Sequence, residues 1–492
     1  MLSYFDKECK EKILFDIREK CGMIEKNLPR RVFVEKIMAV LETVNGWVND
    51  FVWGVPVLLL ILGTGIFYTI RLGFLQFCHP GLLFKETIVK AFKKTNSPER
   101  KPGEVTSFQA AMTSVGAIVG SGNIAGVSTA LVLGGPGALV WMIFAALVGM
   151  ATKFAEIALG IRYREIYQDG TVGGGAMYYL AKGLKQHWLG ILFAALVIPY
   201  AFVISAVVDT NTIALTLNDR YSLPLWVTGL VLAILAAAVI FGGVKRIGRA
   251  SEIIAPFMGG MYILTGLAVV FLHLPQVPAA LWTILKGAFE PQAVTGGAVG
   301  SIFVCMRYGI ARGIYSNEAG LGTAAMVHCG AQVDHPVEQA VWGPVEVFLD
   351  TVLVCTVTAL TVVLSGLLNT TDLDGAVLTM RAFEAMLPGS IGGIVCTASV
   401  VLFGFSCLIS FYTYAERAAV YIFGERSRIV VKLLWVAMIV VGSQTTLGFA
   451  WDLADTINGL MIIPNLVGLI LLSGEVVKLK NEYFGRRLSV HQ

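Results

Sequence analysis

A series of eleven long apolar runs constrains this chain more than any other feature, because each run is long enough to cross a lipid bilayer. A membrane-spanning helix needs about 20 residues, and the runs lack the period-two alternation of barrel strands. Helices are then the spanning structure that satisfies every backbone polar group in lipid. Of the 492 residues, 56% are hydrophobic and only 14% are charged, which excludes a soluble globular fold, a disordered chain and a disulfide scaffold. We therefore predict an all-α integral membrane protein. The runs lie near residues 46–70, 107–133, 137–160, 187–217, 224–243, 251–273, 296–328, 337–366, 391–416, 429–446 and 452–477.

The positive charges of the loops predict the orientation of these helices. If residues 71–106 face the cytoplasm, the loops on that side carry 22 Lys and Arg residues, against three on the other side. The C-terminal tail, residues 481–492, is then cytoplasmic. Residues 1–45 fall outside although they carry nine basic residues, so we expect the later loops to dominate the topology. We predict that residues 1–45 form an amphipathic, basic surface helix.

The second run is interrupted by Gly120, Ser121, Gly122 and Asn123. Each Gly weakens a helix by about 1 kcal/mol relative to Ala, and Asn123 needs a polar partner in hydrocarbon. One reading is close helix packing through a GxxxG pair. The other is a broken helix at the middle of the bilayer, where a half-helix N-terminus holds a carboxylate and freed carbonyls hold a cation.

The seventh run carries a similar interruption, from Arg312 to Gly322, with Glu318 between them. Ionisable residues inside a membrane usually pair, so we expect Arg312 and Glu318 to be candidate partners. The two interrupted runs each begin a set of five helices, near residues 107–273 and 296–477. Because five is odd, the sets must be inverted relative to each other, and corresponding broken helices of inverted repeats indicate a transport site.

Further polar side chains lie at membrane depth. Lys153 and Glu156 have i, i+3 spacing and are predicted to pair with each other. Asp209 has no basic residue within one helical turn. It is a candidate to bind a substrate ammonium or a proton, and a water-filled pocket is the alternative explanation.

Several motifs, in order over residues 46–480, resemble those of the sodium:alanine/glycine symporters, the amino-acid carrier family. The motifs are SFQA at 107–110, GSGNIAG at 120–126, GGPGA at 134–138, GGGAMYY at 173–179, SNEAGLG at 316–322, DTVLVC at 350–355 and NGLMIIPN at 458–465. The resemblance implies the leucine-transporter architecture, with two inverted five-helix repeats and one additional N-terminal helix. It also implies import of a small neutral amino acid (the alanine, glycine, serine and glutamine class) with Na⁺ by alternating access.

The resemblance further implies which residues form the site. The substrate carboxylate is expected at Gly120, Ser121, Gly122 and Asn123, and Na⁺ at the carbonyls near Gly116 and Val119, with Ser406 from the ninth run. The other substrate-binding positions are those of Asp209, Tyr315, Cys407 and Phe411.

The sequence departs from the family pattern at four of these positions. The family usually has Thr at 121, Gln at 209, Thr at 407 and Trp at 411, where this chain has Ser, Asp, Cys and Phe. Phe enlarges the cavity, Asp adds a negative charge, and a thiol is a weaker ligand than a hydroxyl for a hard cation. Coupling to H⁺ through Asp209 is therefore an alternative to Na⁺ coupling.

Other classes of function fit the sequence less well. An ion channel is disfavoured because channels commonly build symmetric pores from several subunits. A membrane enzyme would need a nucleophile–base pair or a metal set, and the carboxylates have no convincing His partner. The net charge of +4 is too small to indicate nucleic-acid binding. We expect a multi-pass protein of the plasma (inner) membrane whose partners are the lipid bilayer and a small amino acid.

Overall fold

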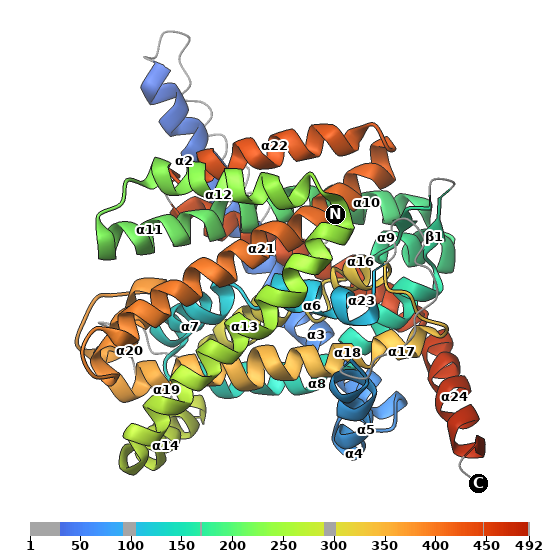
Figure 1. The fold of residues 1–492 in the computed structure, drawn as a ribbon, viewed down its shortest axis with the longest axis horizontal. Coiled ribbons are helices and arrows are strands. Elements are labelled where there is room, and N and C mark those ends of the chain that lie inside the picture. The colour runs from blue at the N-terminus through green and yellow to red at the C-terminus, as the bar shows by residue number, and fades with distance from the viewer. Residues whose placement is uncertain (1–29, 92–104, 168–169, 290–301, 446, 491–492) are drawn as a thin grey trace, which may run out of the picture.

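The computed structural model describes residues 30–91, 105–167, 170–289, 302–445 and 447–490, and it shows a bundle of helices (Figure 1). The described part of the chain begins with α2 (Arg30–Val52) and α3 (Val55–Arg71), and the two helices bend by 42° where they meet. Gly54 and Pro56 lie at this bend, and Pro is favoured in the first turn of a helix because its missing N–H has no helical partner there. The short α4 (Leu75–Cys78), α5 (Pro80–Phe84) and the π-helical η1 (Lys85–Val89) follow.

The first repeat begins with a helix in two pieces, α6 and η2–α7, and continues through four further spans. Its elements are α6 (Ser107–Ile118), η2 (Gly122–Gly126), α7 (Val127–Gly134), α8 (Ala138–Arg162), α9 (Ala176–Tyr178), η3 (Tyr179–Gly183), α10 (His187–Ala201), η4 (Phe202–Asp209), α11 (Thr210–Tyr221), α12 (Leu225–Ile240) and α13 (Gly243–Leu272). A short antiparallel hairpin follows α8, formed by the two-residue strands β1 (Glu165–Ile166) and β2 (Val172–Gly173). The π-helix η4 lies within the fourth run, so the span that carries Asp209 is locally wound more widely than an α-helix.

The second repeat follows η5 (Leu274–Gln276) and α14 (Val277–Phe289), and it also begins with a helix in two pieces. Its elements are α15 (Ile302–Asn317), α16 (Ala324–His328), α17 (Pro336–Ala340), α18 (Trp342–Val347), η6 (Phe348–Cys355), α19 (Thr356–Ser365), η7 (Leu367–Asn369), α20 (Gly375–Met386), α21 (Ile391–Phe423), α22 (Ser427–Gly442) and α23 (Leu447–Leu471), before the terminal α24 (Ser473–Val490). Each of the eleven expected runs is therefore mainly helical over its described residues, with non-helical steps at residues 119–120 of the second run and 318–323 of the seventh. The predicted all-α class is confirmed.

The helices that carry the two interruptions lie in the interior. Almost every residue of α6 and of the second half of α15 is buried, and α8 packs against α3, α15, α16, α17 and α18. The long α21 packs against α6, α10 and α13. Outer helices instead expose large apolar side chains, as a face toward lipid tails requires. Examples are Leu230, Ile234, Phe257, Leu264 and Phe271.

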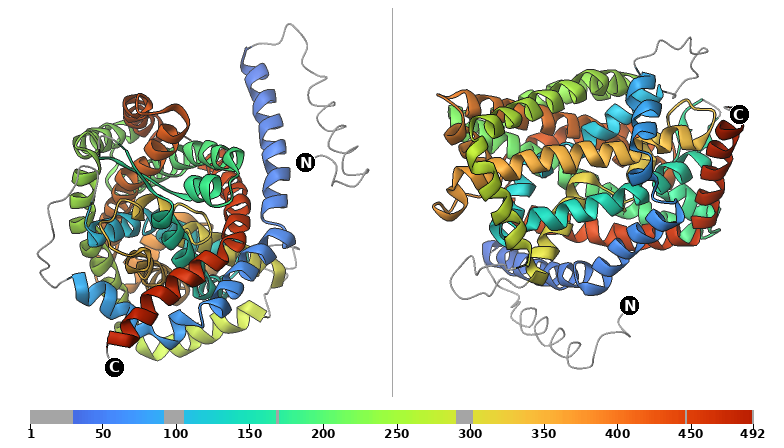
Figure 2. Two further views of the ribbon diagram at one scale, coloured as in Figure 1. Left: turned by 90° about the vertical axis from the view of Figure 1, so that its right-hand side faces the viewer. Right: turned by 90° about the horizontal axis from the view of Figure 1, so that it is seen from below.

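Loops that are predicted to lie on one side of the membrane lie at one end of the bundle. The β1 hairpin and α24 lie at one end, and α14 and α20 lie at the opposite end (Figures 1 and 2). Most of the predicted N-terminal surface helix falls on residues 1–29, outside the described residues. From Arg30 the chain is helical through residue 45 and on to Val52. The C-terminal tail is helical up to Val490.

Candidate functional site: two helix breaks that meet inside the bundle

The first break is a short non-helical step between α6 and η2. A capping box of Thr106 and Gln109 starts α6, and α6 ends at Ile118, where the chain turns by 46°. In an uninterrupted helix the Gly120 N–H would bond to the Gly116 carbonyl. It donates instead to Asn123 Oδ1 at 2.8 Å. The Asn123 side chain therefore stabilises the break, and the Gly116 carbonyl loses its helical donor.

The glycines of this break are required by close contacts with other helices. A Cβ on Gly120 would overlap Cys407 Sγ, and a Cβ on Gly116 would overlap Ser406 Oγ, both on α21. A Cβ on Gly122 would lie 3.0 Å from the Tyr315 ring on α15. The sequence interpretation that favoured only GxxxG packing is thus too narrow. The small residues allow α21 and α15 to approach this segment closely, and the helix is also broken between α6 and η2.

Asp209 reaches the same break from η4. Its Oδ1 accepts a hydrogen bond from Ser121 Oγ at 2.5 Å, and its Oδ2 is buried without a hydrogen-bond partner. Ser205 Oγ and Cys407 Sγ also face this carboxylate. The structure pairs the guanidinium of Arg312 elsewhere, with Asp455 at 2.8 Å. Among the described residues, no ion pair neutralises Asp209.

Two buried hydroxyls on α21 face the end of α6. Ser406 Oγ and Ser410 Oγ lie one helical turn apart, and both lack a hydrogen-bond partner. A Cβ on Gly116 would contact both hydroxyls, so this pair adjoins the backbone whose helical bonding is interrupted. The sequence prediction included Ser406 but missed Ser410, although the i, i+4 spacing of the two serines was a usable signal.

The second break follows the C-terminus of α15. Glu318, Gly320 and Gly322 have positive φ angles of 55°, 98° and 81°. Glu318 is the one non-glycine residue of the three, and its carboxylate accepts hydrogen bonds from the hydroxyls of Tyr200, Thr323 and Tyr414. The expected Arg312–Glu318 pair is wrong, because these hydroxyls satisfy Glu318 while Asp455 pairs with Arg312.

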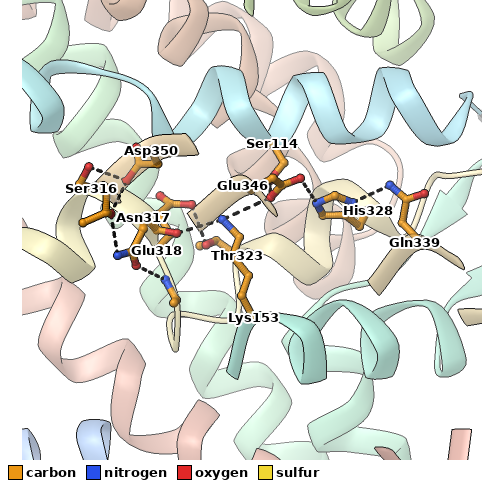
Figure 3. A network of polar contacts seen from close by, with 12 residues as sticks. Ser114, Lys153, Ser316, Asn317, Glu318, Thr323, His328, Gln339, Glu346 and Asp350 are labelled. Carbon is orange, nitrogen blue, oxygen red and sulfur yellow. Dashed lines mark hydrogen bonds and ion pairs between the residues drawn. The ribbon is translucent and has the colours of Figure 1, made fainter. Parts of the chain in front are cut away.

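Lys153 and Glu156 on α8 both serve this second break, and the prediction that they pair with each other is wrong. Lys153 Nζ donates to the Asn317 carbonyl at 2.9 Å and lies 3.4 Å from Glu346 Oε2 (Figure 3). Glu156 Oε1 accepts the Gly322 N–H at 2.9 Å. A helix break leaves backbone groups without helical partners, and such groups require other partners. Here Lys153 binds the Asn317 carbonyl and Glu156 binds the Gly322 N–H, so both α8 side chains satisfy this backbone.

Asp350 joins the two breaks directly. Its Oδ1 accepts from Asn123 Nδ2 at 2.7 Å, and its Oδ2 accepts from Ser316 Oγ at 2.8 Å. These three residues come from η6, η2 and α15. The sequence places Asp350 within the eighth apolar run, one helical turn after Glu346, and at the start of the DTVLVC motif, but nothing local indicates that it lies between two broken helices.

The aromatic residues expected at the site occupy two positions. The Tyr315 ring packs against Gly122 and against Trp451, with a ring-centroid distance of 5.2 Å to Trp451, and its hydroxyl has no hydrogen-bond partner. Phe411 lies one turn after Cys407 and packs on Tyr200 and Tyr414, the two tyrosines that bind Glu318. Tyr315 thus adjoins the first break, and Phe411 lies on the side of the second.

Two inverted sets of spans, each beginning with a helix that is broken in the interior, define the leucine-transporter fold. The crystal structure of MhsT in complex with L-phenylalanine shares this fold, with a TM-score of 0.53 and 17% identity over 77% of this chain and 90% of that chain.

Residues 38–491 match the sodium:alanine symporter family, and the chain belongs to that family. The sodium/alanine symporter AgcS of Methanococcus maripaludis is 43% identical over 87% of this chain and 94% of its own length. An uncharacterized transporter of Haemophilus influenzae is 39% identical over 91% and 97%. The amino-acid carrier protein AlsT of Bacillus subtilis is 37% identical over 89% and 91%. The chain is therefore a multi-pass membrane transporter.

Proposed function

We propose that this protein is a symporter of the plasma (inner) membrane that imports a small neutral amino acid with Na⁺ by alternating access. One observation carries the proposal. At a single helix break, the unpaired oxygen of Asp209 and the unpaired hydroxyls of Ser406 and Ser410 are buried together with interrupted backbone. Buried polar groups without partners are costly, so their presence here supports a site that is completed by ligands.

The amino acid would bind through its two charged groups. Its ammonium would pair with Asp209 Oδ2, because this buried carboxylate lacks a cation. Its carboxylate would lie at the N-terminal end of η2–α7, near Gly120, Gly122 and Asn123, where the helix dipole favours an anion. Tyr315, Cys407 and Phe411 would then bound the space for the substrate side chain.

Na⁺ would bind between α6 and α21. The oxygen ligands would be the carbonyls of Gly116 and Val119 and the hydroxyls of Ser406 and Ser410, since a hard cation prefers oxygen. The Cys407 thiol already donates to the Ala117 carbonyl at 3.2 Å, which leaves the ion to these oxygens.

The names of relatives support an amino acid and a cation as the transported pair. Beside AgcS, they include a probable sodium/glutamine symporter, GlnT, at 35% identity and a putative sodium/proton-dependent alanine carrier, YrbD, at 36%, both of Bacillus subtilis. Alanine, glycine, serine and glutamine are accordingly the first substrates to test.

The second candidate is H⁺-coupled symport, and Asp209 favours it. A buried carboxylate whose Oδ2 has no hydrogen-bond partner is also suited to carry a proton across the membrane. Here the proton would occupy Asp209 before the amino acid binds.

Uptake into proteoliposomes tests both candidates. Radiolabelled alanine, glycine, serine and glutamine are offered under an inward Na⁺ gradient, under an inward H⁺ gradient, and with neither. Na⁺-dependent accumulation of at least one amino acid is expected. Accumulation driven by H⁺ alone would favour the second candidate, and no uptake under either gradient would refute amino-acid symport.

A further inference from the structure

A network of buried side chains lies behind the two breaks, outside the groups assigned to substrate and Na⁺. We call it the charge network, and Figure 3 shows its members at the second break. Lys153, His328 and Glu346 are each 0% exposed, and Lys and Glu are rarely fully buried unless they are paired. The charge network comprises Ser114, Lys153, Asn317, His328, Gln339 and Glu346.

Glu346 on α18 contacts one half-helix of each broken span. Its Oε2 accepts from Ser114 Oγ on α6 at 2.8 Å, and its Oε1 lies 3.0 Å from His328 Nε2 on α16. Both half-helices are on the predicted cytoplasmic side of their breaks. A single carboxylate therefore connects the two segments that would have to separate for the site to open inward.

Lys153 pairs with the Glu346 carboxylate and also binds the C-terminal end of α15. Its ammonium lies 3.4 Å from Glu346 Oε2 and donates to the carbonyl of Asn317, the last residue of α15. A cation is favourable at a helix C-terminus. On the far side, Gln339 Nε2 lies 2.8 Å from His328 Nδ1 and donates to the Ser107 carbonyl at the start of α6. The network thus contacts α6 at its first residue, Ser107, and at Ser114, one turn before its last residue.

We propose that Glu346 and Lys153 are positioning residues for transport, which hold α6 and α16 so that the Gly116 carbonyl is aligned with the hydroxyls of α21. Ser114, which Glu346 binds, is two residues before Gly116. If α6 moved away, Glu346 would lose a donor inside the membrane, where an unsatisfied charged group is expensive. The network therefore favours the arrangement in which the cation site is assembled, and weakening it should lower cation affinity.

Ser114→Ala tests this through the proposed transport function. The variant removes one hydrogen bond from Glu346 and leaves the ion pair with Lys153. The Na⁺ concentration for half-maximal alanine uptake should rise about tenfold, the value expected for a hydrogen bond to a charged group, while the maximal rate changes less than about twofold. Ser399→Ala is the matched control, because Ser399 is also fully buried and its hydroxyl bonds only within α21, to the Val395 carbonyl.

A second measurement does not depend on transport and separates this inference from the proposed function. Lys153→Met combined with Glu346→Gln removes both members of this ion pair together, so neither is left buried as an unpaired charge. Amide hydrogen exchange of the purified variant should accelerate by about tenfold or more in α6 and α16, with little change in α12. Wild-type exchange in α6 and α16 of the double variant, together with wild-type Na⁺ dependence in Ser114→Ala, would overturn the proposal. If the wild-type protein transports no amino acid, the exchange result decides alone.

Discussion

Replacing Asp209 by Asn separates the role of this carboxylate in binding from its role in stability. Asn keeps an oxygen that can accept from Ser121 Oγ, and it removes the negative charge at the break. If the substrate ammonium pairs with Asp209, the substitution truncates one partner of a buried charge pair, which costs about 2–5 kcal/mol. We take the lower half of this range because the Ser121 hydroxyl can still donate to the Asn side chain and so keeps one contact at the break. We therefore expect the KM for alanine to rise about 30- to 300-fold.

Without substrate the same substitution should act in the opposite direction. Asp209 is 1% exposed, and no ion pair of the described residues compensates it. An unpaired buried carboxylate costs folding energy that a neutral amide of the same shape does not. The substrate-free variant should therefore unfold at a higher temperature than the wild type, and alanine should raise this temperature less.

The assay is thermal unfolding of the purified protein in Na⁺, with and without alanine, combined with uptake into proteoliposomes. Asp219→Asn is a suitable control, because Asp219 lies on the adjacent α11 and pairs with Arg381 near the surface. An unchanged KM in Asp209→Asn would refute the assignment of the ammonium to Asp209. Selective loss of H⁺-driven uptake would instead assign it the coupling proton.

Further predictions concern the packing and the ion pairs around the site. Gly120→Ala should abolish uptake, because its Cβ would overlap Cys407 Sγ, and Cys407→Ala in the same chain should restore part of the uptake by vacating that space. Ser406→Ala should raise the Na⁺ concentration for half-maximal uptake about tenfold without changing alanine affinity at saturating Na⁺, and an unchanged Na⁺ dependence would exclude this hydroxyl as a ligand. Asp455→Asn should destabilise the protein by about 3–5 kcal/mol because it leaves the Arg312 guanidinium buried and unpaired, whereas Arg312→Met together with Asp455→Asn should recover most of the thermal stability.

The fold and the positions of both helix breaks could be predicted from the sequence because they depend on local features. Apolar length marks the spans, and Gly and Asn residues in the middle of a run mark the interruptions, as at residues 120–123. The odd number of helices between the two interruptions then required inverted repeats. These inferences need no knowledge of which side chains meet.

The hydrogen-bond and ion-pair partners of the buried polar residues could not be predicted in this way. Arg312 and Glu318 are near neighbours in sequence, yet Arg312 pairs with Asp455, which is 143 residues away. Lys153 likewise binds Asn317 and Glu346 rather than the nearby Glu156. Spacing along one helix predicts pairing on a solvated surface, but inside a bundle the strongest partners are the freed backbone groups and the charges of facing helices.

The partners of the buried carboxylates are the reason why the proposed function assigns the transported ligand to Asp209. Glu156 also has one buried oxygen without a hydrogen-bond partner, but its other oxygen accepts from the Gly322 N–H and from Asn465 Nδ2 at the second break. Glu318 accepts from three hydroxyls, Asp350 from side chains of both breaks, and Glu346 contacts Lys153, His328 and Ser114. These three hold helices together, so a ligand that took their contacts would also loosen the bundle. The contact of Asp209 with Ser121 leaves one oxygen bare at the break itself. Under the proposed function, a cation or proton would bind at this oxygen and leave again without exposing another buried charge, as reversible transport requires.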